Sequence, residues 1–407
     1  MDSIYADPEV ETDSEGQEEA RRQQTRRSTL PDGAFPSPRS LQHLVLKGMA
    51  NNWDWHAKYD NSYLLALPTL LKETLVSYIA VYSEAAANPL RPLFLSGTTP
   101  EERDEVRRLD LSNGLGKWTT IKQLERDLLS TRTSTVLAAS ERAGRNHDHE
   151  SRAPPDSWEA DEEDDPPSPS LSPGTSLSTS PVIPRFKNLR HLSLAISPNH
   201  TKAASWLELL SLANGLGTLA SLSLAYWPQP TYTPNAASTR VTAQTRGSHP
   251  PVVYGGSDIY TAFDNDWREA AGILRALSRA LYCLKWLDLT GCGGWFAALK
   301  WVPPDDEPGS QHIGPEWNGG WRGLEYLCLG IGWIPIMPEA EQADQTPEPG
   351  TTWNVEHERK LYRYRKDVEE HARLRMTARE VVQHIRALRK AHGGKWIDID
   401  LDEGEVP

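Results

Sequence analysis

Residues 284–289 read Leu-Lys-Trp-Leu-Asp-Leu, and the same L-x-x-L-x-L pattern returns five more times along the chain. The other matches, one of which begins with valine, are residues 41–46, 106–111, 189–194, 219–224 and 324–329. A short apolar segment that recurs at intervals indicates a repeat architecture, in which each unit buries its hydrophobic face against the next. We therefore expect these segments to form strands that stand side by side in one parallel sheet. A further strand is expected at Val76, Ile79 and Val81, whose positions match the spacing of the pattern although the residues are not leucine.

The unit between residues 189 and 219 has the clearest pattern. Between its two strand segments, apolar residues follow one face of a helix, namely Trp206, Leu209, Leu210, Ala213 and Leu216. Gly215 or Gly217 is suited to end that helix. The spacing therefore predicts strand, loop, helix and strand. The same periodicity predicts helices around residues 121–129 and 266–281, the second opened by an Asp266–Glu269 capping box.

Composition divides the chain into segments. The N-terminal tail and an acidic, Ser/Pro-rich insertion contain few apolar residues. Burying so few cannot offset the conformational entropy lost on folding, so both segments are predicted to be disordered. In the C-terminal part, apolar periodicity predicts two amphipathic helices within 356–388, the second capped by Thr377 and Glu380. The alternating residues 396–401 then predict an edge strand, and this part is expected to cap the end of the sheet. The expected divisions are a tail (1–39), a first repeat half (40–132), the insertion (133–183), a second repeat half (184–335), a linker (336–352) and a helical cap (353–407).

Charge excludes several classes of partner. Lys and Arg total 43 against 56 Asp and Glu, a formal charge of −13, which opposes attraction to nucleic acid and to anionic lipid. The sequence has no secretion signal and no apolar run of the roughly 18 residues that a membrane span needs. The three cysteines, Cys283, Cys292 and Cys328, lack metal-ligand spacing and are interpreted as reduced packing residues. We expect a soluble protein of the cytoplasm or nucleus that binds neither nucleic acid nor membrane.

No motif indicates catalysis. The glycine-rich turns at 113–117 and 291–294 match neither phosphate-binding nor dinucleotide-binding patterns, and no G-x-S-x-G element is present. The ligand-type run 147–150, His-Asp-His-Glu, falls in the insertion, where nothing holds a metal geometry. We therefore expect no catalytic residue, no metal, no cofactor and no small-molecule substrate, and a protein that is not an enzyme.

The strand segments resemble the leucine-rich repeat family, whose consensus is L-x-x-L-x-L-x-x-N/C-x-L. The resemblance covers residues 41–329, interrupted by insertions. The leucines at positions 1, 4 and 6 are present, but the Asn or Cys of position 9 is matched only by Cys292. The resemblance implies an α/β solenoid with a parallel sheet on its concave side and helices on its convex side, here short and irregular.

Alternating side chains of the expected strands form one row on the concave side. Its aromatic, imidazole and charged members are the composition of a protein-binding hot spot. The predicted partner-binding residues are His43, Tyr78, Arg108, Asp110, His191, Trp286, Asp288 and Tyr326. An alternative is that an insertion covers Trp286, which then serves packing.

Tryptophan is frequent, with 15 in the chain, and three follow the strand segments at similar distances: Trp53, Trp118 and Trp295. We interpret them first as wedges between strand and helix, and alternatively as the lining of an aromatic ligand groove.

The function expected is a protein-interaction scaffold that is regulated or tethered through the acidic insertion. The alternative is the substrate-recognition subunit of a ubiquitin ligase, because such repeats often follow an F-box. The region before residue 41 is too short and polar to supply one.

Overall fold

The structure is a computed structural model, and it describes twelve stretches of the chain. They are residues 22–23, 30–31, 33, 35–84, 86–131, 182–197, 203–232, 241–243, 252–254, 267–302, 314–337 and 352–401. The run 147–150 and most of the acidic insertion lie outside the described residues.

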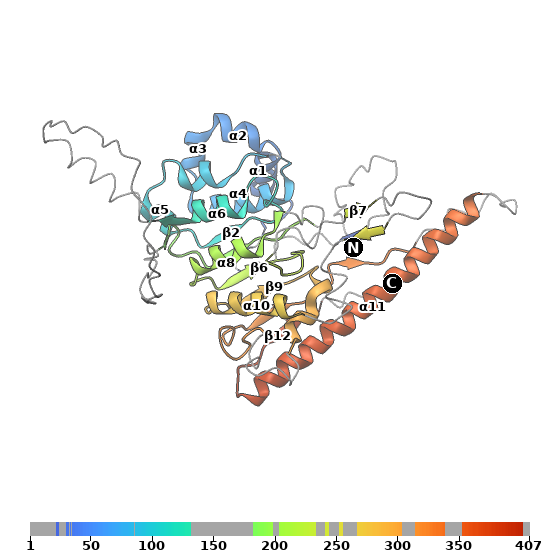
Figure 1. Cartoon of the computed structure of the whole chain (residues 1–407). Coiled ribbons are helices and arrows are strands. Elements are labelled where there is room, and N and C mark those ends of the chain that lie inside the picture. Colours follow the sequence, from blue (N-terminus) through green and yellow to red (C-terminus); the bar gives the residue numbers. More distant parts are fainter. Residues whose placement is uncertain are drawn as a thin grey trace, which may run out of the picture.

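A parallel sheet of six strands runs through the molecule (Figure 1). Its order follows the chain: β2 (Arg108–Asp110), β5 (His191–Ser193), β6 (Ser221–Ser223), β9 (Trp286–Asp288), β10 (Tyr326–Cys328) and β12 (Asp398–Asp400). Leu222 is in register with Leu192 on one side and with Leu287 on the other. The prediction that leucines from distant repeats stand side by side is therefore confirmed, as is the α/β class.

The turn after several strands has the same backbone conformation. Three positions beyond the end of β2, β6 and β9, the residues Asn113, Tyr226 and Gly291 have φ of 57°, 61° and 79°. Asparagine and glycine adopt this left-handed region readily, whereas tyrosine does so at a cost in energy. A tyrosine in this position indicates that its ring makes contacts that offset the cost.

Helices pack in a row against one face of the sheet, each in contact with the next. They are α6 (Ile121–Leu128), α8 (Trp206–Asn214), α10 (Arg268–Ala280) and the 3₁₀ helix η3 (Gly293–Lys300). Thr120 caps α6 and Ser205 caps α8, because each side chain accepts a hydrogen bond from a backbone N–H of the first turn. Gly215 follows α8 as predicted. Trp267 is the residue before α10 and makes no side-chain cap, and Asp266 lies outside the described residues.

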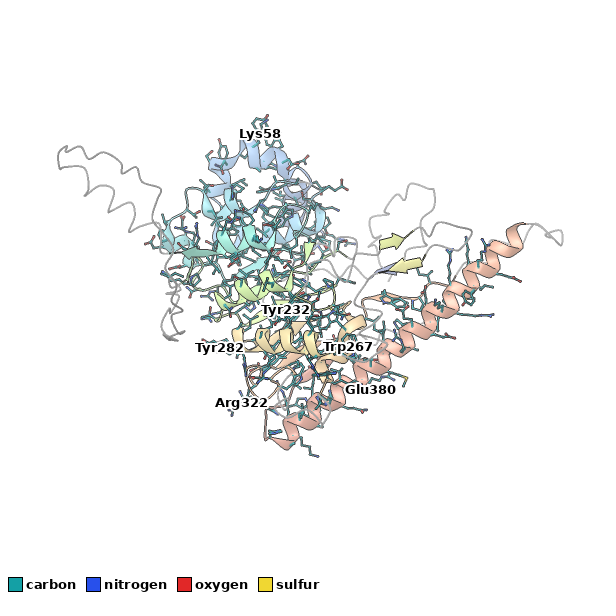
Figure 2. The ribbon with its side chains drawn as sticks, in the orientation of Figure 1. Lys58, Tyr232, Trp267, Tyr282, Arg322 and Glu380 are labelled. Atoms are coloured by element: carbon teal, nitrogen blue, oxygen red, sulfur yellow. The ribbon has the colours of Figure 1, made fainter. Side chains whose placement is uncertain are left out.

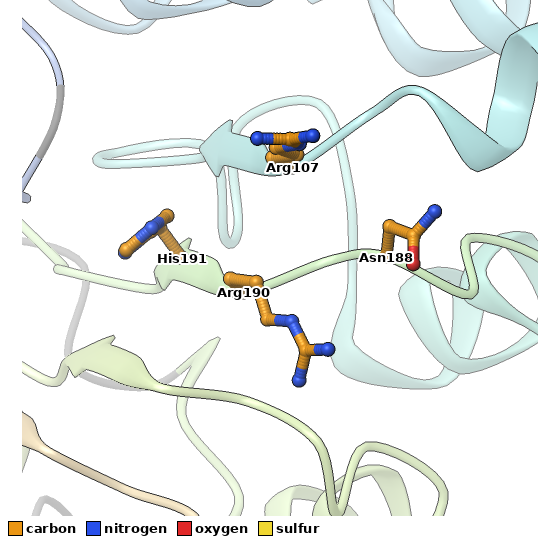
Figure 3. Close-up of a pocket in the computed structure, with 4 residues that line it drawn as sticks. All are labelled: Arg107, Asn188, Arg190 and His191. Atoms are coloured by element: carbon orange, nitrogen blue, oxygen red, sulfur yellow. The ribbon is translucent and has the colours of Figure 1, made fainter.

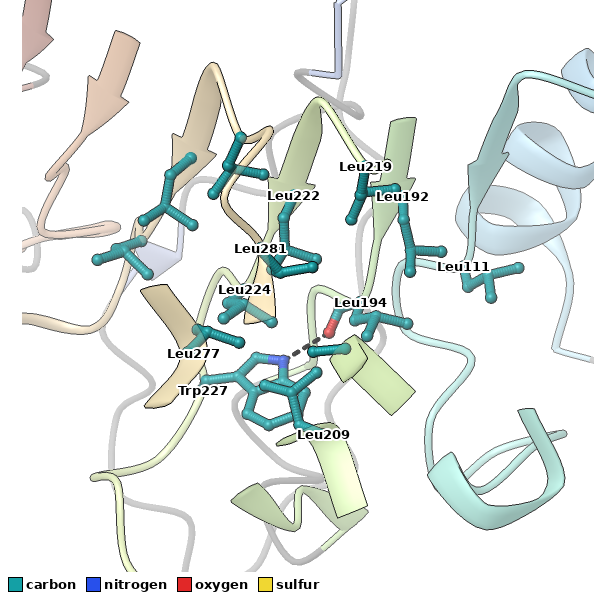
Figure 4. Close-up of a cluster of buried hydrophobic side chains, with 14 of the residues drawn as sticks. Leu111, Leu192, Leu194, Leu209, Leu219, Leu222, Leu224, Trp227, Leu277 and Leu281 are labelled. Carbon is teal, nitrogen blue, oxygen red and sulfur yellow. Dashed lines mark hydrogen bonds between the residues drawn. The ribbon is translucent and has the colours of Figure 1, made fainter. Parts of the chain in front are cut away.

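The hydrophobic core lies between this sheet face and the helices (Figure 4). Leucines of the strands point toward Leu209 and Leu277 of the helices, and the indole N–H of Trp227 donates to the backbone oxygen of Leu194 at 2.7 Å. Trp206, Trp227 and Trp295 form an aromatic cluster with edge-to-face contacts. Trp53, Trp118 and Trp295 are all buried, which supports their interpretation as packing residues.

The N-terminal region is helical, so two of the expected strands are wrong. It consists of α1 (Leu41–Asn51), α2 (Trp53–Tyr59), α3 (Asn61–Leu65), α4 (Thr69–Tyr82), the π-helical turn η1 (Arg91–Leu95) and α5 (Pro100–Asp104). The segment 41–46 matched the strand pattern, but its leucines also fit helical spacing, and the Ser40 side chain caps α1 by accepting from the N–H of His43. Val76 and Ile79 lie on the buried side of α4, which packs beside β2.

The C-terminal part contains one helix where two were expected. The single helix α11 (Thr352–Ala391) extends past the sheet (Figure 1). Thr377 does not cap a second helix, because its hydroxyl donates to the backbone oxygen of Arg373 one turn earlier. In Figure 2, Glu380 projects from the half of α11 that packs on η3, where it forms an ion pair with Lys300. The edge strand is confirmed, because β12 pairs with β10.

Three two-stranded antiparallel pairs complete the described elements: β1 (Arg22–Gln23) with β11 (Trp333–Ile334), β3 (Leu129–Thr131) with β4 (Val182–Pro184), and β7 (Val241–Ala243) with β8 (Val252–Tyr254). The β3–β4 pair brings the two ends of the acidic insertion together. The β1–β11 pair fixes part of the segment 1–39, which was expected to be a disordered tail. Among the described helices, none has the length and apolarity to cross a membrane.

Candidate partner-binding face

The sheet face opposite the helices carries the predicted binding row, and we call it the polar face. Its side chains come from the first and third residue of each strand. They are Arg108, Asp110, His191, Ser193, Ser221, Ser223, Trp286, Asp288, Tyr326, Cys328, Asp398 and Asp400. The structure thus brings six of the eight predicted residues to one face.

Asp110 and Asp288 are buried, so the expectation that they face solvent is wrong. The exposed fraction is 0% for Asp110 and 3% for Asp288. Each carboxylate folds back on the end of its own strand: Asp288 accepts from the backbone N–H and the hydroxyl of Thr290 at 3.0 and 2.6 Å. Asp288 also accepts from the Ser223 hydroxyl of the neighbouring strand at 2.9 Å. These hydrogen bonds give the carboxylates a structural role in closing the strand ends.

Asp110 repeats this arrangement in β2. It accepts from the backbone N–H of Ser112 at 3.2 Å and from its hydroxyl at 2.6 Å, and that hydroxyl lies 2.8 Å from the hydroxyl of Ser193. Its second oxygen, Oδ2, is buried without a hydrogen-bond partner among the described residues. Buried polar atoms are normally hydrogen-bonded, so this oxygen favours binding of a group that places a hydrogen-bond donor on the polar face.

His43 and Tyr78 are not on the sheet, because both belong to helices. They form a buried contact between α1 and α4, in which His43 Nδ1 and the Tyr78 hydroxyl lie 2.7 Å apart. The ring of Phe35 packs on Tyr78 with centroids 4.8 Å apart. Their predicted place in the binding row is therefore wrong, because the row rested on two strands that are helices.

Arg108 lies at the β2 end of the polar face and is also buried, with 8% of its surface exposed. Gly33 lies against its guanidinium: a Cβ added to Gly33 would lie 1.9 Å from the guanidinium carbon of Arg108. On its other side, Glu73 of α4 accepts from the backbone N–H groups of Arg107 and Arg108. Burial raises the pKa of Glu73 against the lowering effect of these hydrogen bonds and of the two arginines.

His191, Trp286 and Tyr326 are the predicted residues that remain half-exposed. Trp286 and Tyr326, on adjacent strands, stack with ring centroids 5.9 Å apart and an interplanar angle of 3°. The Tyr326 hydroxyl donates to Asp400 at 2.9 Å, and His191 Nδ1 lies 3.0 Å from the hydroxyl of Ser221. The face therefore presents a flat aromatic pair whose orientation is fixed by its neighbours.

The cysteines near this face are poor nucleophiles. Burial, followed by the nearby Asp288 carboxylate, raises the pKa of Cys328 to about 11. Burial raises the pKa of Cys292 well above its ordinary value, and its Sγ donates to the backbone oxygen of Leu224. Both thiols are therefore protonated at neutral pH, which agrees with their interpretation as packing residues.

A basic depression lies at the edge of the sheet where β2 and β5 begin (Figure 3). It has a volume of about 380 Å³ and is lined by Arg107, Asn188, Arg190 and His191. The Arg190 guanidinium donates to the backbone oxygen of Thr218 and points away from Arg107. The cations therefore do not converge on one point. Among the described residues, no group of three or more His, Cys, Asp or Glu has metal-binding geometry.

Sequence reasoning missed a second surface, the outer face of α1. His43, Leu46 and Ala50 of this helix face the core, whereas Leu41, Leu44 and Val45 on the opposite side are 76%, 59% and 49% exposed. Gly48 lies on the same outer face, and a Cβ there would meet nothing within 4 Å. The interpretation of residues 41–46 as a strand concealed this face. Helical periodicity from the Ser40 cap onward would have revealed apolar residues on both sides.

Comparison with known proteins gave no match to a protein-family model, to a curated protein or to a solved structure.

Proposed function

We propose that the chain is a non-enzymatic protein-interaction scaffold, an irregular leucine-rich-repeat-like solenoid that binds a protein partner on its polar, concave face. The observation that supports this most is the stacked pair of Trp286 and Tyr326, half-exposed on adjacent strands. Tryptophan and tyrosine are the residues most enriched in interface hot spots. The Tyr326–Asp400 hydrogen bond holds the pair in place before a partner arrives, which reduces the entropy lost on binding.

The test is co-purification of partners with the full chain. We compare wild type, the double variant Trp286→Ala/Tyr326→Ala, and Trp396→Ala, which removes an aromatic ring that is 74% exposed and lies beside Arg386 of α11. We expect quantitative mass spectrometry to find a partner that wild type and Trp396→Ala retain equally and that the double variant loses at least tenfold. Circular dichroism verifies that each variant is folded. Equal retention by the double variant would refute the proposal.

A second candidate is the substrate-recognition subunit of a ubiquitin ligase, favoured by the N-terminal helices. The objection to this function was that the region before residue 41 is too short and polar to bind an adaptor. That objection assumed that the strands begin at 41–46 and 76–81. The helices α1 to α4 occupy that region instead. The outer face of α1 has the apolar i, i+3, i+4 pattern of a helix that docks in a groove. Gly48 costs α1 about 1 kcal/mol relative to alanine, and a closely packed partner would account for it.

Leu44→Glu tests this second function. We expect the variant to lose a co-purifying ligase adaptor and the ubiquitin-transfer activity of the purified complex, while partners of the polar face stay bound. Leu207→Glu places the same charge at a 56% exposed leucine of α8 and serves as the matched control. Retention of the same adaptor by both variants would exclude the outer face of α1 as its docking site.

A further inference from the structure

We propose that a groove at the edge of the sheet, where β2 and β5 begin, binds an extended peptide of a partner protein that carries one basic and one acidic side chain. The basic side chain lies against carboxylates near the start of α4, and the acidic side chain pairs with Arg107. Of the residues that line the groove, only His191 also belongs to the polar face. This second site therefore does not depend on whether the polar face binds a partner.

The groove consists of two adjoining cavities. One is the basic depression of about 380 Å³ (Figure 3), and the other has a volume of about 500 Å³ and lies beside the start of α4 and the end of α5. Arg107 and Asn188 line both cavities, which places them side by side. Each volume is in the range of known ligand pockets. The lining residues carry charged or polar side chains except for Leu70, so charge is the property by which the groove selects a ligand.

Carboxylates make the α4 end of the groove acidic. Glu73, Asp104 and Glu105 line it, and Lys187 forms an ion pair with Asp104 at 2.7 Å. Glu73 is only 8% exposed, and its Oε1 atom accepts from two backbone N–H groups at the start of β2, at 2.6 and 3.1 Å. Its Oε2 atom has no hydrogen-bond partner among the described residues. Burial raises the pKa of this carboxyl group, and a cation against Oε2 opposes that effect, so this end suits a lysine or arginine side chain.

Arg107 supplies the opposite charge. Its side chain is exposed, and within the described parts of the chain its guanidinium forms no hydrogen bond and no ion pair. The backbone nitrogen of Arg107 lies 2.6 Å from Glu73 Oε1, so the two charges are within the reach of one arginine side chain. A guanidinium presents its donors in a planar fork that matches a carboxylate. The acidic side chain of the ligand therefore lies a short distance from its basic one.

Both backbone groups of Arg107 are already hydrogen-bonded. Its N–H donates to Glu73, and its oxygen accepts from the N–H groups of Arg190 and His191 at 2.8 and 3.0 Å. The ligand is therefore recognised by its charges rather than by addition of a strand. Arg190 adds positive charge at the β5 end, but its guanidinium donates to Thr218 and points away from Arg107. Cations that do not converge favour separated charges on an extended chain over a single phosphate group.

The test measures binding of short synthetic peptides to the full chain. The blocked, fluorescein-labelled probes carry one lysine and one glutamate, in either order, separated by a graded series of glycine spacers. Comparison peptides carry two lysines at the same spacings. Fluorescence anisotropy is measured at about 0.15 M salt, which screens the general attraction of an acidic chain for cations. We expect the best Lys/Glu peptide to bind wild type at least tenfold more tightly than the Lys/Lys peptide of the same spacing, because only the Lys/Glu peptide complements both charges of the groove.

Reversing one charge of the groove should reverse its preference. We expect Arg107→Glu to bind the Lys/Lys peptide more tightly than the Lys/Glu peptide, and Arg107→Gln, which only removes the charge, to abolish the preference. Arg322→Glu is the matched control, because it makes the same charge change at an exposed arginine just before β10 and should leave the preference unchanged.

Circular dichroism verifies that each variant is folded, and Arg107→Gln decides alone if Arg107→Glu is not. The inference is overturned if wild type binds no Lys/Glu peptide, if the Arg107 variants keep the preference of wild type, or if Arg322→Glu inverts the preference as well.

Discussion

The turn after β9 offers the sharpest test of how the turns of neighbouring strands pack together. Gly291 has φ of +79°, and a Cβ there would lie 2.3 Å from a ring carbon of Tyr226 in the preceding turn. The Tyr226 hydroxyl continues across to the next turn and donates to the backbone oxygen of Gly332 at 2.8 Å. Gly291→Ala therefore introduces one methyl group at the point where one tyrosine links three successive turns.

The cost of Gly291→Ala has two parts. An L-residue in the left-handed region costs about 1–2 kcal/mol. The methyl also pushes the Tyr226 ring away, and loss of its hydrogen bond to Gly332 costs about 1 kcal/mol more. We expect the free energy of unfolding to fall by about 2–3 kcal/mol. In a Tyr226→Ala background the contact with the ring is absent, so the same substitution should cost only about 1–2 kcal/mol.

The assay is chemical denaturation followed by tryptophan fluorescence, with Gly294→Ala as the matched control. Gly294 lies three residues later, without a positive φ, and a Cβ there would meet nothing within 4 Å. We expect Gly294→Ala to leave stability unchanged or to raise it by up to about 1 kcal/mol. The reasoning is refuted if the two alanine variants unfold at the same denaturant concentration, or if removal of the Tyr226 ring leaves the cost of Gly291→Ala unchanged.

Three more predictions follow from buried groups. Leu222→Ala, in the central strand pair, should lower the free energy of unfolding by about 3–5 kcal/mol, whereas Leu70→Ala at an exposed site should change it little in the same denaturation assay. Arg389 of α11 donates to the backbone oxygens of Trp321 and Leu324. Arg389→Lys should lower the free energy of unfolding by about 2–4 kcal/mol, because lysine lacks the planar guanidinium that donates to both oxygens. Burial, and after it the nearby Arg375 charge, lowers the pKa of His371. The folded state therefore binds fewer protons than the unfolded state, so the free energy of unfolding falls as the pH drops below about 6.5. His371→Gln should flatten that decline in melting temperature between pH 7 and 5, and an unchanged slope would contradict the assignment.

Where the sequence pattern had two readings, the structure decided between them. The segment 41–46 has leucines at positions 1, 4 and 6, which fit both a strand and a helix. From residue 189 onward, each segment with this pattern has a neighbouring strand on both sides that pairs with its backbone. Residues 41–46 have none, and the Ser40 cap favours the helix. Thr377 likewise has the chemistry of a cap, but its hydroxyl bonds to the preceding turn and α11 continues.

The candidate site was predictable in part for the same kind of reason. Alternation along a strand placed Arg108, His191, Trp286 and Tyr326 on one face, because that depends on local geometry alone. Burial of those side chains depends on what packs against the face. The segment around Gly33 has too few apolar residues to indicate a packed position, so nothing local revealed that it lies against Arg108.

The sequence by itself determined the register of the sheet, because each leucine triplet can bury its side chains in only one alignment with its neighbours. It also determined the helices α6, α8 and α10, whose apolar periodicity is unambiguous. Only the tertiary structure decided that the first helices replace strands, that α11 is continuous and that Gly33 lies against Arg108. Each of these depends on contacts between residues far apart in the chain, and the free energy of such contacts is not encoded in any single local pattern.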